Sequence, residues 1–218
     1  MNAPRTVFTS ARLTIRELGL DDAEPLRAMH ADRRVTALLI DDAGVPLDQL
    51  ANATAFIRAV HGLYRRYAGY GIWAVESSVG ASVGGAGLFC GFIALMPVDE
   101  LPGDVEIGIR LAPSAWGGGL SFEATRLVLV HGFDVLGLPA IFAFCDPRNR
   151  SARLNNEAQG AVWLRDAHHQ GALASHYRLS RAVFDATRHQ TRGQRMRAIL
   201  RGPQHSGLQD LLPPVPRG

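Results

Sequence analysis

The sequence contains no lysine: its 23 basic residues are all arginine, and 20 acidic residues leave a net charge of +3. Two explanations are open, namely escape from modification of lysine side chains and the preference of a GC-rich genome for arginine codons; we favour the second. Most of the positive excess follows Arg178, so it is a property of the end of the chain. That end lacks interleaved aromatic residues and a recognition fold, and we do not expect nucleic acid as a partner.

Cysteine and long apolar runs are also scarce. Cys90 and Cys145 are the two cysteines, and they lie in apolar stretches typical of strands, without the spacing of a metal site or a disulfide framework. We interpret them as buried free thiols. The longest apolar run, residues 87–98, is too short to span a bilayer, and charged residues interrupt the start of the chain where a signal peptide would be apolar. We therefore expect a cytoplasmic protein without a membrane partner.

The composition that is present suits a globular protein, because 47% of the 218 residues are hydrophobic. This length predicts one domain with a tail. We assign residues 1–185 to the domain. We assign residues 186–218 to a basic extension, rich in proline and glycine near its end and partly disordered.

Residues 105–124 are the most informative stretch. Apolar and polar residues alternate over residues 104–111, which predicts a strand, and Pro113 ends it. Three glycines, Gly117 to Gly119, come next, and apolar residues at helical spacing then predict a helix from Gly119 or Leu120 to about Leu136. Glycines let the backbone approach a ligand closely, and the first amides of a helix have no partner. A strand, a glycine turn and a helix start therefore predict a phosphate-binding site.

Two segments carry a resemblance to a known family. Residues 110–133, RLAPSAWGGGLSFEATRLVLVHGF, resemble the acyl-CoA-binding motif of the GCN5-related N-acetyltransferases (GNAT), most closely in the branch of ribosomal-protein N-terminal acetyltransferases. Residues 146–163, DPRNRSARLNNEAQGAVW, match the second family pattern of an asparagine, a helix of about ten residues and a glycine, with Asn149 and Gly160 at those positions. The resemblance extends over about residues 11–184.

The resemblance implies an α+β GNAT fold, with a mixed central sheet of about seven strands flanked by helices. The fourth strand, residues 104–111, and the fifth, residues 140–145, are expected to be parallel and splayed apart. The chain is expected to end its sheet with strands at residues 161–165 and 176–184. Between those strands we expect a turn containing His168 and His169, to which we assign no function.

The resemblance also implies acetyl-CoA as co-substrate and no metal. Six backbone amides are expected to bind the pyrophosphate of acetyl-CoA: those of Trp116, Gly117, Gly118, Gly119, Leu120 and Ser121. Backbone donors of Ile109, Arg110 and Leu111 are expected at the thioester oxygen. Asn149 is expected to contact the pantetheine arm. Asn149 is equally suited to capping a helix. Arg153, with Arg148 and Arg150, is expected either at the 3′-phosphate or as a solvated helix residue. The family often has glutamine or arginine where this chain has Ser114, so one contact is weakened.

Glu106 is the candidate base, because it lies on the face of its strand opposite Val105 and Ile107, and the family places a glutamate in this region. The alternative is an exposed strand residue paired with an arginine. Ser151 is the candidate acid for the leaving thiolate, although relatives often have a serine at the position of Ala152 or a tyrosine in this helix.

Two functions are consistent with these residues. The first is an acetyl-CoA-dependent N-acetyltransferase acting on a primary amine, either a protein N-terminus or a small molecule. The second is a catalytically silent acyl-CoA-binding or regulatory protein, which the missing tyrosine and serine favour. A Glu106 carboxylate that faces the cleft would favour the enzyme. A nucleotide-binding module is disfavoured, because no lysine follows the glycines. The sequence leaves a homodimer open.

Overall fold

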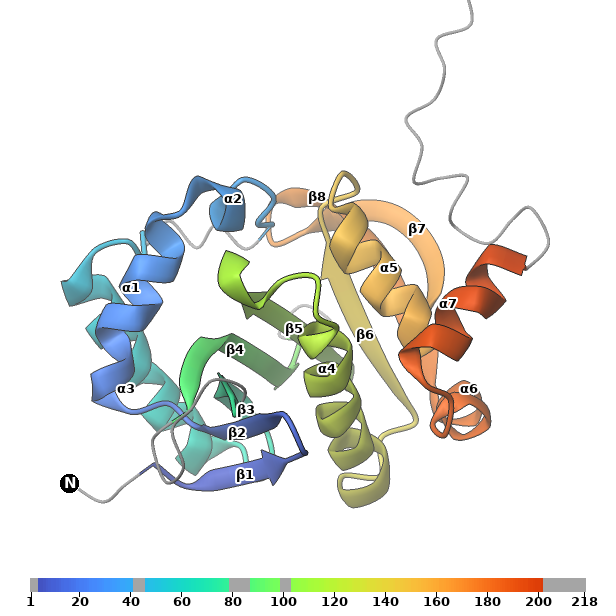
Figure 1. Ribbon diagram of the computed structural model, residues 1–218, viewed down its shortest axis with the longest axis horizontal. Coiled ribbons are helices and arrows are strands. Elements are labelled where there is room, and N and C mark those ends of the chain that lie inside the picture. The colour runs from blue at the N-terminus through green and yellow to red at the C-terminus, as the bar shows by residue number, and fades with distance from the viewer. Residues whose placement is uncertain (1–3, 41–45, 79–86, 99–102, 202–218) are drawn as a thin grey trace, which may run out of the picture.

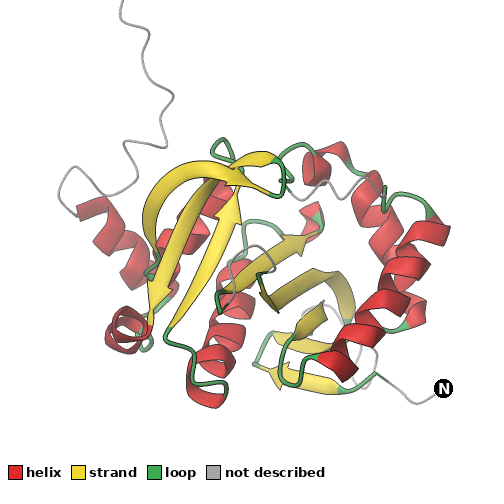
Figure 2. Ribbon diagram, turned by 180° about the vertical axis from the view of Figure 1, so that it is seen from behind, coloured by secondary structure: helices red, strands yellow, loops and turns green. Residues whose placement is uncertain are grey.

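The computed structural model describes residues 4–40, 46–78, 87–98 and 103–201. These residues form one mixed sheet of eight strands with helices on both faces (Figure 1, Figure 2). The strands are β1 (Thr6–Thr9), β2 (Leu13–Glu17), β3 (Gly71–Ser77), β4 (Leu88–Pro97), β5 (Val105–Leu111), β6 (Ala140–Cys145), β7 (Val162–His169) and β8 (Ala172–Ser180). The α-helices are α1 (Ala23–Ala31), α2 (Arg33–Thr36), α3 (Leu50–Arg66), α4 (Leu120–Val130), α5 (Arg150–Gln159), α6 (Arg181–Thr187) and α7 (Arg192–Arg201). Short helical turns are η1 (Leu20–Asp22), η2 (Pro113–Ala115) and the π-helical η3 (His131–Val135).

The sheet opens between two of its central strands. Its order is β1-β2-β3-β4-β5-β6-β8-β7, and β4 pairs with β5 antiparallel along the whole of β5. In contrast, β5 pairs with the parallel strand β6 only at Glu106 and Phe142. This pair lies near the start of β5, so the two strands separate toward their carboxyl ends, as Figure 1 shows. The edge of β5 that faces β6 is therefore available over its second half.

The strand count corrects the sequence prediction of about seven strands. The additional strand is β1, which pairs antiparallel with β2. Its residues Thr6–Thr9 read polar, apolar, apolar, polar, so no alternation marks them as a strand in the sequence. With β1 counted, the parallel pair consists of the fifth and sixth strands rather than the fourth and fifth.

The prediction for the last two strands was also wrong in detail. His168 and His169 belong to β7, and the turn to β8 is limited to Gln170 and Gly171, both with positive φ (50° and 82°). Residues 181–184, expected in a strand, begin helix α6, whose N-cap is Ser180. The strand predicted at residues 161–165 is the first half of β7. Because β7 is largely exposed and has no apolar alternation, its second half could not be recognised in the sequence. Residues 202–218 of the predicted extension lie outside the described residues.

Each face of the sheet has its own core. Under α4, buried residues of β5 and β6 such as Ile107 and Ile141 pack with Val128. On the opposite face, residues of α1 and α3 pack with Ala74 and Phe92. Because successive side chains of a strand point to opposite faces, the alternating residues of β5, beginning with Glu106, point to the side of α1 and α3.

Gly91 fixes the backbone of β4 beside β5. It has φ of +136°, and a Cβ atom there would lie 2.1 Å from the carbonyl oxygen of Arg110. An alanine at this position would have an unfavourable φ, and its Cβ would clash with the Arg110 carbonyl oxygen unless the backbone moved.

We therefore expect Gly91→Ala to lower the free energy of unfolding by about 2–4 kcal/mol. Gly62→Ala is the matched control, because a Cβ there meets nothing within 4 Å and the residue lies inside α3. That control should raise stability slightly, since alanine is the better helix former. Urea unfolding measures both, and an unchanged midpoint for Gly91→Ala would contradict the contact.

Candidate active site

The glycine turn between β5 and α4 is held by the backbone and by one tryptophan. Gly119 is the N-cap of α4 with φ of +78°, and no side chain caps the helix. Gly117 has φ of +82°, and a Cβ at Gly117 or Gly118 would meet nothing within 4 Å, so the turn faces open space. Trp116 Nε1 donates to the carbonyl oxygen of Leu111 at 2.8 Å and ties the turn to the end of β5. The first amides of α4, including Leu120 and Ser121, are therefore presented as an anion cradle.

The second predicted segment forms the neighbouring helix α5. Asn149 is its N-cap, with Oδ1 accepting from Ala152 N at 3.1 Å, and Gly160 ends it with φ of +99°. Thus the capping function of Asn149 is confirmed. Ser151 is exposed in the first turn of α5. Both helix starts follow the carboxyl ends of β5 and β6, the edge at which these strands separate.

Arg153 points into the protein rather than into solvent. Its side chain is buried; Nε donates to Tyr177 Oη at 3.0 Å and Nη1 to Pro147 O at 3.3 Å. Burial in turn raises the pKa of Tyr177. The structure thus does not bear out a solvated Arg153, and its binding to a 3′-phosphate stays a prediction.

Glu106 lies where the two strands part, on the side of α1. Its side chain is 26% exposed, and Oε2 lies 3.5 Å from His169 Nε2 at the end of β7. The His169 ring is buried and stacks on Phe144, with 3.9 Å between the ring centroids. The carboxylate is therefore half-buried beside an imidazole, not paired with an arginine among the contacts found in the described residues. Sequence reasoning missed His169, because only the pairing of β7 with β8 brings it to this face.

Arg110 and His30 form a second polar contact on the same side. His30 Nδ1 lies 2.8 Å from Leu26 O, and Nε2 lies 2.7 Å from Arg110 Nη1. A guanidinium can only donate, so Nε2 accepts and the proton of the neutral ring is on Nδ1. The Arg110 guanidinium also lies over the Phe92 ring at 5.2 Å. The side chain of Arg110 is thus directed to α1, while its backbone stays in β5.

The backbone of Ile109, Arg110 and Leu111 forms the second half of β5. This half lies beyond the pair formed by Glu106 and Phe142, along the edge that β6 leaves. The structure therefore brings the three expected parts together: the glycine turn, the open edge of β5 and Glu106 at its base.

Comparison with known proteins agrees with this arrangement. Residues 12–162 match the acetyltransferase (GNAT) domain family. The chain belongs to the GNAT acetyltransferase family. It is an enzyme of acetyl transfer, and GNAT acetyltransferases use acetyl-CoA. The family resemblance inferred from residues 110–133 and 146–163 is confirmed.

Individual relatives are distant in sequence. The uncharacterized N-acetyltransferase p20 of Bacillus licheniformis is 28% identical over 144 residues, which cover 66% of this chain and 75% of p20. Among solved structures, RimL, a ribosomal L7/L12 alpha-N-protein acetyltransferase in complex with coenzyme A, has a TM-score of 0.66 at 12% identity, covering 81% of this chain and 98% of RimL. A GNAT acetyltransferase of Bacillus anthracis has a TM-score of 0.64 at 19% identity, covering 79% and 96%. At these identities the structures share the GNAT fold.

Within the described residues no helix is long and apolar enough to cross a membrane. In the same part of the chain no three histidine, cysteine, aspartate or glutamate residues are grouped as a metal site would require.

Both thiols of the acetyltransferase are buried. Burial raises the pKa of Cys145 to about 12 and also raises the pKa of Cys90. At pH 8 a thiol of that pKa is ionised in about one molecule in 10⁴, and only the thiolate reacts readily.

We expect a disulfide reagent to label neither Cys90 nor Cys145 in the folded protein within minutes. Both should react once denaturant exposes them. Absorbance of the released thiolate measures the reaction, and rapid labelling of the folded protein would show that these strands open. Because its own thiols do not react, the folded protein adds no background signal when the same reagent is used to detect the thiol of released coenzyme A.

Proposed function

We propose that this acetyltransferase transfers the acetyl group of acetyl-CoA to a primary amine. The observation that carries the proposal is the position of Glu106, whose carboxylate faces the side of α1 at the point where β5 and β6 part. An amine that approaches from this side would meet the base beside the open edge of β5. The acceptor is a protein N-terminus or a small-molecule amine.

The chain's own residues are suited to hold acetyl-CoA. The glycine turn and the first amides of α4 would bind the pyrophosphate, because the turn is open and the helix start carries partial positive charge. Backbone groups of residues 109–111 would bind the pantetheine arm and the thioester oxygen. Asn149 caps α5, and at the start of that helix it would also contact the arm. When bound, acetyl-CoA supplies an acetyl thioester, which is reactive toward amines.

Glu106 would prepare the acceptor. A protonated amine has no lone pair, so it must lose a proton before it can attack the thioester carbon directly. Glu106 would accept that proton, and His169, 3.5 Å away, would position the carboxylate and share its charge. No covalent intermediate with the enzyme is required.

The leaving thiolate needs a proton. Ser151 is exposed at the start of α5 and is one donor of suitable position; solvent is another. The buried hydroxyl of Tyr177 is engaged by Arg153 inside the protein. We therefore assign the acid to Ser151 or water rather than to Tyr177.

Release of coenzyme A in the presence of amines tests the function. Acetyl-CoA binding would first be measured by calorimetry, and thiol release would then be followed with peptides that have a free N-terminus and with small primary amines. Turnover on any of them supports the proposal. Binding without turnover on a broad set would favour the alternative, a silent acyl-CoA-binding protein on the GNAT fold.

A further inference from the structure

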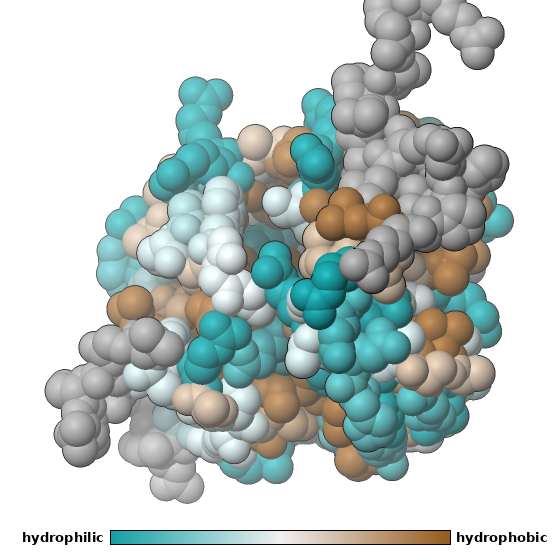
Figure 3. Space-filling model, turned by 45° about the vertical axis from the view of Figure 1, so that its right-hand side comes forward, coloured by the Kyte–Doolittle hydropathy of each residue, from teal (hydrophilic) through white to brown (hydrophobic). Residues whose placement is uncertain are grey.

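A pocket rich in arginine adjoins the glycine turn on the outer side of α4. We define the arginine pocket by Arg12, Gly118, Gly119, Glu123, Arg126 and Arg192, among the residues that line a volume of about 420 Å³. Three arginines and one glutamate give this lining a net charge of +2. Figure 3, which turns the right-hand side of Figure 1 forward, shows hydrophilic residues gathered across the middle and lower right of this face.

The glutamate of the pocket is already neutralised. Glu123 Oε2 forms an ion pair with Arg12, and Oε1 accepts from Ser10 Oγ at 2.6 Å. Arg12 also donates to the carbonyl oxygen of Gly118 at 3.0 Å and so ties the pocket to the glycine turn. The charge that remains is that of Arg126 and Arg192.

Arg126 is a buried cation without a counter-ion in the described residues. All three of its guanidinium nitrogens are shielded from solvent and have no hydrogen-bond partner there. The guanidinium lies 5.1 Å from the ring of Phe122 and 5.5 Å from that of Phe184. Burial, with repulsion from Arg195 and Arg188, lowers the pKa of Arg126 to about 10. An unpaired buried charge is costly, so an anion in the pocket would relieve that cost.

Arg192 is brought to the pocket by α7, which follows the region matched to the GNAT domain. A Cβ on Gly119 would lie 3.2 Å from Arg192 Cδ, so this side chain covers the N-cap residue of α4. Thr191 and Gln194 form reciprocal hydrogen bonds that begin α7 just beside Arg192. Arg195 donates to the carbonyl oxygens of Ala158 and Glu157 at the end of α5 and anchors the helix. The position of Arg192 is therefore built into the fold.

We propose that the arginine pocket binds a phosphomonoester dianion. A dianion matches the net charge of the pocket, and Arg12 and Arg192 would donate hydrogen bonds while buried Arg126 contributes its charge. The pocket shares Gly118 and Gly119 with the turn assigned to the pyrophosphate, and in coenzyme A a single ribose separates the pyrophosphate from the 3′-phosphate. The ligand in the bound complex is thus the 3′-phosphate of acetyl-CoA, an assignment that rests on the proposed function and that replaces the contact predicted for Arg153, whose guanidinium is engaged by Tyr177 and Pro147.

Calorimetry with acetyl-CoA and 3′-dephospho-acetyl-CoA tests the assignment on the full chain. We expect acetyl-CoA to bind at least tenfold more tightly. Arg192→Gln should reduce the difference to less than threefold and leave the affinity for the dephospho compound unchanged. Arg197→Gln, an exposed arginine of the same helix, is the matched control and should keep the full difference. Arg126→Met should reduce the difference while raising the melting temperature of the free protein, because it removes an unpaired buried charge.

Inorganic phosphate is the second probe and separates this inference from the proposed function. It should raise the melting temperature of the free wild-type protein and have no such effect on Arg192→Gln. If acetyl-CoA binds, both CoA compounds bind equally and phosphate has no effect, the inference is overturned and the proposed function stands. If neither CoA compound binds but phosphate stabilises through Arg192, the pocket stands as a phosphate site and the proposed function falls.

Discussion

Glu106→Gln is expected to lower kcat/KM for the acceptor amine by roughly 10²- to 10⁴-fold, the range in which general bases contribute. Glutamine keeps the size of the side chain but cannot accept the proton of an ammonium group. Affinity for acetyl-CoA should not change, because Glu106 lies at the base of the β5 edge rather than in the glycine turn. Initial rates of coenzyme A release, with calorimetry on the same samples, measure both quantities.

The pH dependence of kcat/KM shows whether Glu106 acts as a base or only supports the structure of the site. In the variant, log kcat/KM should continue to rise with pH toward the pKa of the amine itself, because solvent must then remove the proton. Glu24→Gln is the control, since this glutamate is exposed on α1 and forms a surface pair with Arg27. Full activity of Glu106→Gln across the pH range would eliminate the carboxylate as base and return the choice to His169 or solvent.

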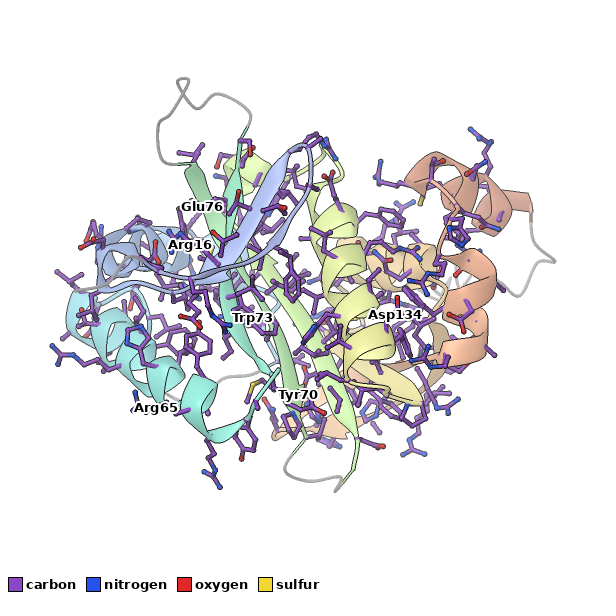
Figure 4. All side chains as sticks on the ribbon, turned by 90° about the horizontal axis from the view of Figure 1, so that it is seen from below. Arg16, Arg65, Tyr70, Trp73, Glu76 and Asp134 are labelled. Carbon is purple, nitrogen blue, oxygen red and sulfur yellow. The ribbon has the colours of Figure 1, made fainter. Side chains whose placement is uncertain are left out.

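The second large effect concerns stability. Arg16 of β2 donates to both oxygens of Asp22 at 2.7 Å and to Glu76 of β3 at 2.6 and 2.9 Å. The side chains of Arg16, Asp22 and Glu76 are only 15%, 7% and 12% exposed. Figure 4 shows Arg16 and Glu76 side by side. Hydrogen bonds to Asp22 and Glu76, against the opposing effect of burial, raise the pKa of Arg16.

Arg16→Met is expected to lower the free energy of unfolding by about 3–5 kcal/mol, because two carboxylates would remain buried without a cation. Arg27→Met is the matched control: it breaks a pair with Glu24 that is open to solvent, so the urea midpoint should hardly move. The triple variant Arg16→Met, Asp22→Asn, Glu76→Gln should recover part of the loss, since it leaves no buried charge. A small loss for Arg16→Met would show that water reaches the two carboxylates.

Several parts of this protein could be predicted from the sequence because they depend on neighbouring residues. Alternation predicted β5, the glycines after Pro113 predicted the turn, and Asn149 and Gly160 marked the ends of α5. Each of these signals acts through local backbone conformation: glycine permits positive φ, and an asparagine side chain caps a free amide. The family resemblance depends on the same residues, so fold and activity followed from short stretches.

Other features were decided only when distant segments met. β1 has no apolar alternation and is recognised as a strand only by its pairing with β2. His169 was expected in a turn, and the pairing of β7 with β8 places it beside Glu106. Arg126 and Arg192 are 66 positions apart and share a pocket because α7 docks on α5 and covers Gly119. The sequence by itself determined which segments turn, cap and alternate. Tertiary structure decided which charges are buried together, because burial depends on packing between segments that no local pattern encodes.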